Sequence, residues 1–202
     1  MSANGQNSSF RPAKGSSIKV DPIRDLKAIK RIKKILSDSP RDLCLFTFGI
    51  NTAYRAGELL SITVGQVDHL RAGERLDLKQ SKTGKYRDTS LNPTVITALH
   101  AWLKKHPDTR PDAPLFMSRR GKAALGVSAV NHMVKRWCAD VGLKGNFGSH
   151  SLRKTWGYHQ RVQKGTPVAL LMAAFGHATE AQTLAYLGIQ AEEIRELFAM
   201  EL

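Results

Sequence analysis

Residues 149–186, SHSLRKTWGYHQRVQKGTPVALLMAAFGHATEAQTLAY, hold most of the side chains from which a reaction could be built. The segment from His150 to Arg153 is predicted to open a helix capped by Ser149, a residue type favoured at helix N-termini. His150 and Arg153 are three residues apart, so both project from one helical face. The start of this segment is therefore predicted to place the titratable ring of His150 beside the permanent positive charge of Arg153.

The same stretch ends with a tyrosine that follows a Gly-His pair. Tyr186 comes nine residues after His177 in Gly176-His177. Thr179 and Gln182 have the spacing of a capping box, which predicts that Tyr186 lies on a short helix just after that turn. Three other tyrosines lack a Gly-His pair nine residues upstream: Tyr54, Tyr86 and Tyr158.

A β-hairpin is predicted in the middle of the chain. Leu76 and Leu78 alternate with polar residues, residues 81–85 (SKTGK) form a polar turn, and residues 86–91 return. Lys82 lies at the tip of this hairpin, where its side chain is expected to be exposed.

The remaining elements are predicted to be helices. Asp21-Pro22 is interpreted as an N-cap and a first helical position, before an apolar stripe formed by Ile23, Leu26, Ile29, Ile32 and Leu36. Arg55 and Glu58 share one face of a short helix at i, i+3. Further helices are expected over about 41–54, after the cap Asn92-Pro93, over 127–141, and as four short helices after the loop 145–148. The fold class is thus mainly α with a small antiparallel β-sheet (α+β).

Length and charge limit the possible functions. The 202 residues fit one domain, predicted over 21–202, after a flexible basic tail over 1–20. Thirty-one Lys and Arg against seventeen Asp and Glu give a net charge of +14. Such an excess indicates a polyanionic partner, DNA or RNA, although a merely soluble basic surface is the simpler alternative.

Two observations concern the compartment. Cys44 and Cys138 stand far apart in apolar stretches, which is typical of buried thiols in a reducing environment. Neither a run of about 18 apolar residues nor the apolar core of a signal peptide is found. A cytoplasmic protein with no membrane partner is expected.

Motifs of nucleotide and metal enzymes are missing from the sequence. It has no G-x-x-x-x-G-K-[ST], no H-E-x-x-H or Cys/His zinc spacing, and no G-x-S-x-G. Acidic residues are scattered, unlike those of a two-metal nuclease. Phosphoryl chemistry on this chain would therefore use side-chain cations and a side-chain nucleophile, with no cofactor.

Four motifs, taken together and in this order, resemble the tyrosine recombinase, or phage integrase, family. The resemblance covers about 21–202 and rests on Thr52–Leu60 (TAYRAGELL), Ser81–Gly84 (SKTG), His150-x-Leu152-Arg153, and Phe175-Gly176-His177 with Tyr186. The family usually has Gly where Ala53 stands and Leu where Phe175 stands, which we interpret as local packing changes. The resemblance implies a tyrosine recombinase catalytic-domain fold.

The resemblance also implies how strands would be cut and rejoined, without metal or ATP. Arg55 and Arg153 would hold the non-bridging oxygens of the scissile phosphate, because a guanidinium binds phosphate bidentately. Tyr186 would attack phosphorus and form a 3′-phosphotyrosyl bond, as in type IB topoisomerases. Lys82 would protonate the leaving 5′ oxygen, with Lys85 as the nearby competitor for this role.

The remaining residues of the site receive supporting roles. His150 would accept the proton of Tyr186 or bind the phosphate, and His177 would hydrogen-bond the same phosphate. Glu58 would orient a neighbouring cation. Contacts with the DNA backbone are predicted for Lys85, Arg119, Arg120, His132, Lys135 and Arg136. The other histidines are interpreted as structural: His69, His100, His106 and His159, with His132 open to either reading.

The resemblance extends to partners. Double-stranded DNA is the expected substrate, and the family works as a tetramer on DNA, so a homo-oligomer is expected there, with a monomer possible without DNA. On DNA the protein would associate with a prokaryotic nucleoid. The apolar face of residues 191–202 would dock either in a neighbour or on its own core.

Two readings from other classes stay open at this point. The first is a DNA-binding regulator on the same scaffold, with weak or partner-dependent catalysis, and the second is a basic RNA-binding module. Family members usually carry an N-terminal helical domain that is not expected here. The chain is therefore either a fragment or a short member of the family.

Overall fold

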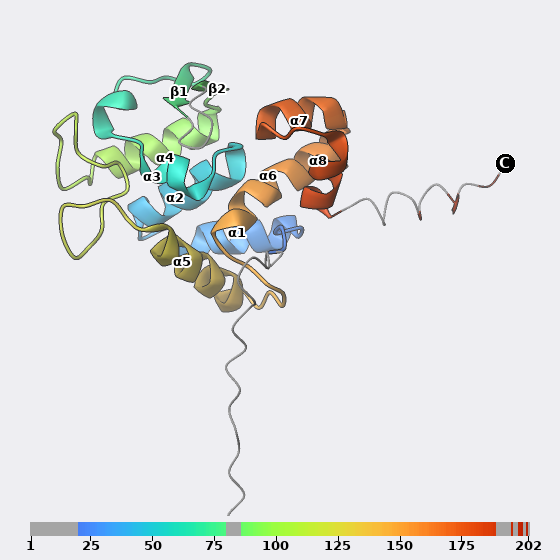
Figure 1. Ribbon diagram of the computed structural model, residues 1–202. Helices are drawn as coiled ribbons and strands as arrows, with labels where there is room; N and C mark the ends of the chain where they lie inside the picture. The colour runs from blue at the N-terminus through green and yellow to red at the C-terminus, as the bar shows by residue number, and fades with distance from the viewer. Residues whose placement is uncertain (1–19, 80–85, 189–194, 196–197, 200, 202) are drawn as a thin grey trace, which may run out of the picture.

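The computed structural model describes residues 20–79, 86–188, 195, 198, 199 and 201. Their helices are α1 (Leu26–Ile35), α2 (Pro40–Asn51), α3 (Ala56–Leu60), α4 (Pro93–Leu103), α5 (Val127–Asp140), α6 (Ser149–Lys164), α7 (Val168–Phe175) and α8 (Glu180–Leu187). A 3-10 turn spans Val64–Gln66, and the strands are β1 (Arg75–Lys79) and β2 (Tyr86–Ser90). The prediction of a mainly helical fold with a small antiparallel sheet is confirmed (Figure 1).

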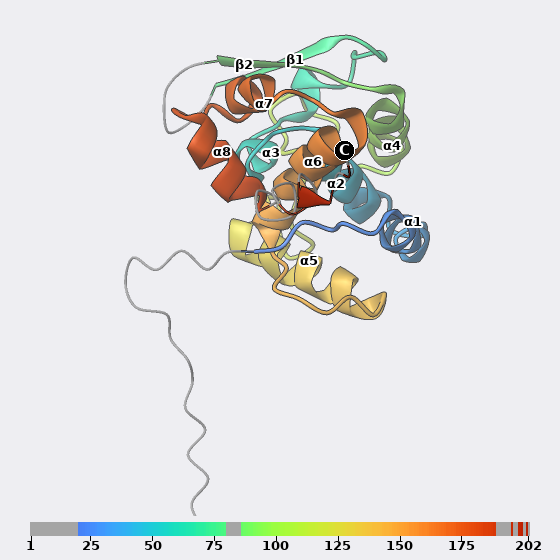
Figure 2. The same ribbon diagram turned by 90° about the vertical axis from the view of Figure 1, so that its right-hand side faces the viewer.

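The main core forms around α2, which packs against both α4 and α6 (Figures 1 and 2). Phe46 and Phe48 on α2 are fully buried, and the Phe46 ring meets Trp137 of α5 edge to face, with centroids 5.9 Å apart. A Cβ on Gly49 would lie 2.6 Å from Cδ1 of Leu152, so the lack of a side chain lets α6 approach α2 closely. This approach brings the end of α2 near the start of α6.

The predicted hairpin is present, with Arg75 opposite Ser90 and Lys79 opposite Tyr86. The predicted turn, residues 81–85, lies outside the described residues. The Tyr54 hydroxyl, which is buried, donates a 2.7 Å hydrogen bond to the carbonyl oxygen of Leu76. The hairpin is thereby tied to the segment that immediately precedes Arg55.

Several predicted helix ends are wrong. The first helix begins at Leu26, capped by Asp25, whose Oδ1 accepts from Lys27 N–H at 2.7 Å. Asp21 instead accepts from the backbone N–H of Asn146 at 2.9 Å. The second helix ends at Asn51 because Thr52 is extended (φ −130°, ψ 159°). Leu26, placed in the apolar stripe, is 47% exposed.

The start of α6 also differs from the prediction. Its N-cap is Gly148, and Ser149 is the first helical residue. Ser151 Oγ accepts from the Gly148 N–H at 3.0 Å, and Asn131 Oδ1, from α5, accepts from the Ser149 N–H at 3.1 Å. A side chain 18 positions upstream therefore does what Ser149 was expected to do. α6 is also long, with 16 residues, and not one of a set of short helices.

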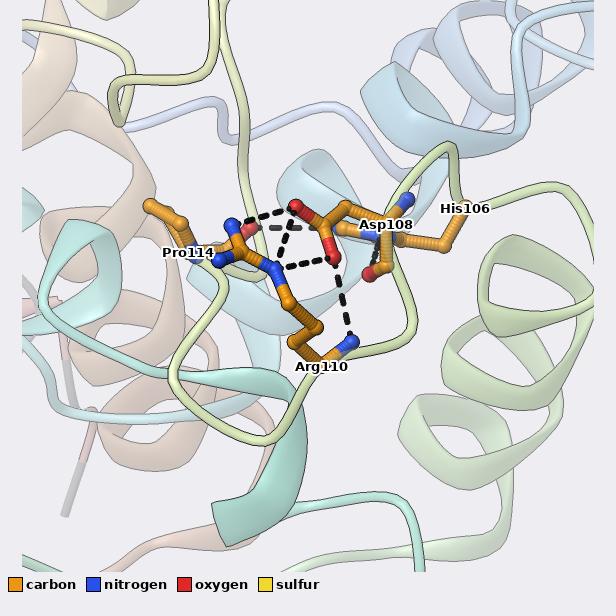
Figure 3. Close-up of polar contacts among 4 residues, drawn as sticks. All are labelled: His106, Asp108, Arg110 and Pro114. Carbon is orange, nitrogen blue, oxygen red and sulfur yellow. Dashed lines mark hydrogen bonds and ion pairs between the residues drawn. The ribbon is translucent and has the colours of Figure 1, made fainter.

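The loop between α4 and α5 is held by polar contacts around His106 (Figure 3). The His106 ring is buried, with Nδ1 2.6 Å from the carbonyl oxygen of Asp108 and Nε2 3.1 Å from that of Pro114. Hydrogen bonds from Arg110, first through its side chain and then through its backbone, lower the pKa of Asp108 to about 2. His106 thus has the structural role expected of it.

A second, small apolar cluster joins α6, α7 and α8. Its buried members are Ala53, Leu171, Phe175 and Leu187, with Trp156, Tyr158 and Tyr186 packed against them. A Cβ on Gly157 of α6 would lie 2.7 Å from Cδ2 of Leu187 and closer still to the Phe175 ring. α7 and α8 therefore rest directly on the backbone of α6.

This close approach predicts that Gly157→Ala destabilises the protein. Overpacking a well-filled contact costs about 1–3 kcal/mol, which exceeds the gain from alanine in a helix, roughly 0.5–1 kcal/mol. Gly57→Ala in α3 is the control, because nothing lies within 4 Å of its added Cβ. Urea unfolding of the full chain measures both. Equal stability of the two variants would refute the close packing on α6.

Candidate active site

Arg55 lies at the N-cap of α3, where the extended segment from Thr52 turns into the helix. Glu58, in the first turn of α3, holds it at two points. Glu58 Oε2 accepts from the backbone N–H of Arg55 at 2.6 Å, and Glu58 Oε1 pairs with Arg55 Nη1 at 2.7 Å. The Glu58 side chain is 4% exposed and that of Arg55 30%. A buried carboxylate thus fixes a partly exposed guanidinium.

Arg153 reaches the same carboxylate from α6. Its Nη1 lies 3.9 Å from Glu58 Oε2, and its Nη2 donates to the carbonyl oxygen of Phe175 at 2.5 Å. The guanidinium carbon lies 4.8 Å from the centre of the Phe175 ring. Glu58 therefore stands between two cations that are almost a hundred residues apart in sequence.

Tyr186 closes the other side of this arrangement, on α8. Its ring meets the rings of His177 and Phe175 edge-on, with both centroid distances 5.2 Å. Its hydroxyl is buried and lies close to the side chain of Arg153. Burial raises the pKa of Tyr186, whereas the nearby charges of Arg153 and Arg55 act to lower it.

His177 is positioned by the turn that ends α7. Gly176 adopts left-handed backbone (φ 64°), which a glycine accepts without strain. The His177 ring then stacks on Phe175, with centroids 5.1 Å apart, and its Nδ1 lies 3.0 Å from Thr183 Oγ1 on α8. Phe175 thus contacts Arg153, His177 and Tyr186. It therefore links three residues of the site, whereas the sequence suggested only a local packing role.

His150 occupies the first turn of α6 and has an exposed side chain. Partial desolvation of its ring lowers its pKa, and the positive charges of Arg153, Arg55 and Lys154 lower it further. The ring is therefore neutral around pH 7, in the form that accepts a proton.

The structure brings together Arg55, Glu58, His150, Arg153, His177 and Tyr186 from α3, α6, the turn after α7, and α8. Lys82 and Lys85 lie outside the described residues. Three residues predicted to contact DNA have exposed side chains on α5, which packs on both α3 and α6: His132, Lys135 and Arg136.

Arg119 and Arg120 lie away from this site. Arg119 approaches Asp42, at the first turn of α2, with 3.6 Å between Nη2 and Oδ2. Arg55 follows the opposite end of α2, and a helix of 12 residues is about 18 Å long. Any DNA contact made by this pair is therefore distant from the two site arginines.

Sequence reasoning missed Lys154. It follows Arg153 directly and is only 7% exposed, with Nζ 5.0 Å from the centre of the Tyr186 ring. Its spacing of four from His150 was the available signal, because residues at i and i+4 share a helical face.

The described residues contain neither a metal-binding cluster nor a membrane-spanning helix. No group of three His, Cys, Asp or Glu side chains in that part of the chain could hold a metal ion. Of the helices described, none is both long and apolar enough to cross a membrane.

Comparison with known proteins identifies the family. The model of the phage integrase family matches residues 23–193. A probable integrase/recombinase, YoeC of Bacillus subtilis (strain 168), is 32% identical over 183 residues, which are 89% of this chain and 95% of YoeC. The tyrosine recombinase XerC of Haemophilus ducreyi is 25% identical over 86% of this chain but only 57% of its own length.

Solved structures agree on the fold. A crystal structure of XerA recombinase matches with a TM-score of 0.71 at 22% identity, over 94% of this chain and 65% of that one. XerH recombinase bound to a palindromic difH substrate matches with a TM-score of 0.71 at 20% identity, over 90% of this chain and 54% of that one. The motif order, the fold and the family match agree: the chain belongs to the phage integrase family of tyrosine recombinases and has the fold of their catalytic domain.

Proposed function

We propose that this chain is a site-specific DNA recombinase, or integrase, that cuts and rejoins strands through a covalent 3′-phosphotyrosyl bond at Tyr186. One observation carries the proposal. Two arginines share the buried carboxylate of Glu58, and the tyrosine that they influence has a buried hydroxyl. A phosphodiester placed against the arginines would meet both the cations and the nucleophile.

Arg55 and Arg153 would hold the two non-bridging oxygens of the scissile phosphate. Each guanidinium is permanently charged and presents a planar fork of donors. Negative charge grows on those oxygens as Tyr186 attacks, so fixed cations stabilise the transition state more than the ground state. Glu58 keeps the two guanidiniums in place before DNA arrives, which avoids reorganisation during the reaction.

The reaction is a single displacement in which one bond to phosphorus forms as another breaks, and each proton has a donor and an acceptor. The Tyr186 oxygen forms a bond to phosphorus and gives its proton to His150, whose lowered pKa favours the neutral, accepting form. The bond from phosphorus to the 5′ oxygen breaks, and Lys82 supplies the proton for that leaving group. His177 would donate a hydrogen bond to the phosphate. Rejoining is the reverse, because the covalent bond stores the energy of the broken diester, as in type IB topoisomerases.

Duplex DNA is the proposed partner. The net charge of +14 suits a polyanion. Fold neighbours include XerH bound to difH substrate and a lambda integrase dimer bound to a COC′ core site. A tetramer on two sites is proposed for the assembly, with residues 191–202, most of which lie outside the described residues, as the exchanged segment. Residues 21–202 are proposed as the catalytic domain.

The covalent step predicts that Tyr186→Phe abolishes a protein–DNA adduct and leaves DNA binding unchanged. The substrate is a nicked suicide duplex built on sequences that the protein selects from a random library, and a denaturing gel detects the adduct. Tyr158→Phe is the matched control, because Tyr158 packs in the same small cluster. Adduct formation by Tyr186→Phe would refute the assignment of Tyr186 as the nucleophile. Tight, selective DNA binding with no adduct from the wild type would favour a DNA-binding regulator instead.

The lowered pKa of His150 predicts how the cleavage rate changes on the acid side of its pH profile. Its pKa lies below the ordinary value of 6.5, so the neutral form persists below that pH and is lost only as the pH falls further. Cleavage by the wild type should therefore stay constant from pH 7 down to about 6.5 and decline below it. His150→Gln should be slow, with no such decline. His69→Gln, at a 64% exposed side chain, should keep the wild-type profile; a decline above pH 7 in the wild type would contradict the role of His150.

The shared carboxylate predicts a large effect of Glu58→Gln. A neutral amide cannot pair with both arginines, so the cleavage rate should fall about tenfold to a hundredfold. Glu74→Gln is the matched control, because Glu74 Oε2 likewise accepts from a backbone N–H three residues upstream, that of Arg71, at 2.7 Å on an exposed surface. Single-turnover cleavage rates compare the two. Equal cleavage rates for Glu58→Gln and Glu74→Gln would show that Glu58 has no role in the reaction.

A further inference from the structure

The site contains a buried lysine to which the proposed reaction gives no task. Lys154 is 7% exposed, although lysine is rarely buried without a specific reason. Its Nζ lies 5.0 Å from the centre of the Tyr186 ring, within the range of a cation–π contact. The lysine belongs to α6 and the ring to α8, so the contact joins two elements of the site.

The chemistry of the ring makes this contact sensitive to the state of Tyr186. An ammonium is attracted to the negative face of a neutral phenol ring. It is attracted more strongly to a phenolate, whose charge is delocalised into the ring. The two arginines already favour the charged form of Tyr186, and Lys154 adds a cation that acts through the ring instead of through the phosphate.

Lys154 also acts on the proposed proton acceptor. Its positive charge helps to lower the pKa of His150, after partial desolvation, Arg153 and Arg55. Among the residues that the structure describes, the charged and titratable groups facing this region are Arg55, Glu58, Arg153, Lys154, His177 and Tyr186. One ammonium thus favours loss of the proton from Tyr186 and keeps His150 in the form that receives it.

We infer that Lys154 is a positioning residue for the reaction proposed for Tyr186: its ammonium holds the Tyr186 ring and stabilises negative charge on it during attack and release. The inference rests on the proposed function. A purely structural role would require only the four-carbon stem of the lysine, which packs as an apolar chain. Lys154→Met keeps most of that volume and removes the charge, whereas Lys154→Arg keeps the charge.

The first experiment measures adduct formation by the full chain on the nicked duplex. Lys154→Met should be slower by about tenfold, and its acid decline should move to higher pH because His150 loses a neighbouring cation. Lys154→Arg should remain within about threefold of the wild type. A Met variant with the wild-type rate and profile would overturn the inference. So would Met and Arg variants that are equally slow, because the charge would then have no role.

The second experiment needs no DNA. The chain has four tyrosines, and 13Cζ-tyrosine labelling, with Tyr186→Phe to assign the signal, reports the phenol titration of Tyr186. The pKa of Tyr186 should be higher by about one unit in Lys154→Met and close to the wild-type value in Lys154→Arg. An unchanged pKa in the Met variant would overturn the inference. If the wild type forms no adduct, the proposed function fails, and this titration still decides whether Lys154 acts on the ring.

Discussion

The arrangement of the site depends on one buried carboxylate. Glu58 caps the backbone of α3 and pairs with Arg55, and its other side approaches Arg153 on α6. Removing one partner of a buried ion pair costs about 3–5 kcal/mol, so the fold gains by keeping α3 and α6 at a fixed separation. The local geometry of a five-residue helix and the spacing of the two guanidiniums proposed to bind phosphate therefore both depend on Glu58.

Periodicity in the sequence predicts most elements but not their ends. Leu76 and Leu78 alternate with polar residues, and the hairpin follows. Asp21 has the features of a cap, yet its carboxylate binds Asn146, 125 positions away. Likewise, Gly148 and not Ser149 is the N-cap of α6, because the side chain of Asn131 on α5 reaches the start of that helix. At these two positions the outcome depends on long-range contacts, which local spacing does not contain, whereas Asn92 and Thr179 cap α4 and α8 locally.

The candidate site is likewise predicted only in part by the sequence. Motif order singles out Arg55, Arg153 and Tyr186, and the fold brings them near one another because α6 packs against the end of α2 and carries α7 and α8. The spacing of Lys154 from His150 places it on the same helical face, but it does not predict burial, since a lysine beside an arginine on a helix is normally solvated. Only the docking of α8 across α6 covers this lysine with an aromatic ring.

The cluster beneath Tyr186 is separate from the main core: its few buried side chains come from α7, α8 and the segment before Arg55, and partly buried side chains of α6 pack against them. Small units with few buried contacts open locally at lower free energy than the domain unfolds. The proposed nucleophile, Tyr186, would thus be carried by a small cluster that can open locally, while Arg55 stays held by Glu58 in the first turn of α3. A tyrosine joined to a moving DNA end could then follow that end by local opening, while Arg55 and Glu58 keep their places on α3.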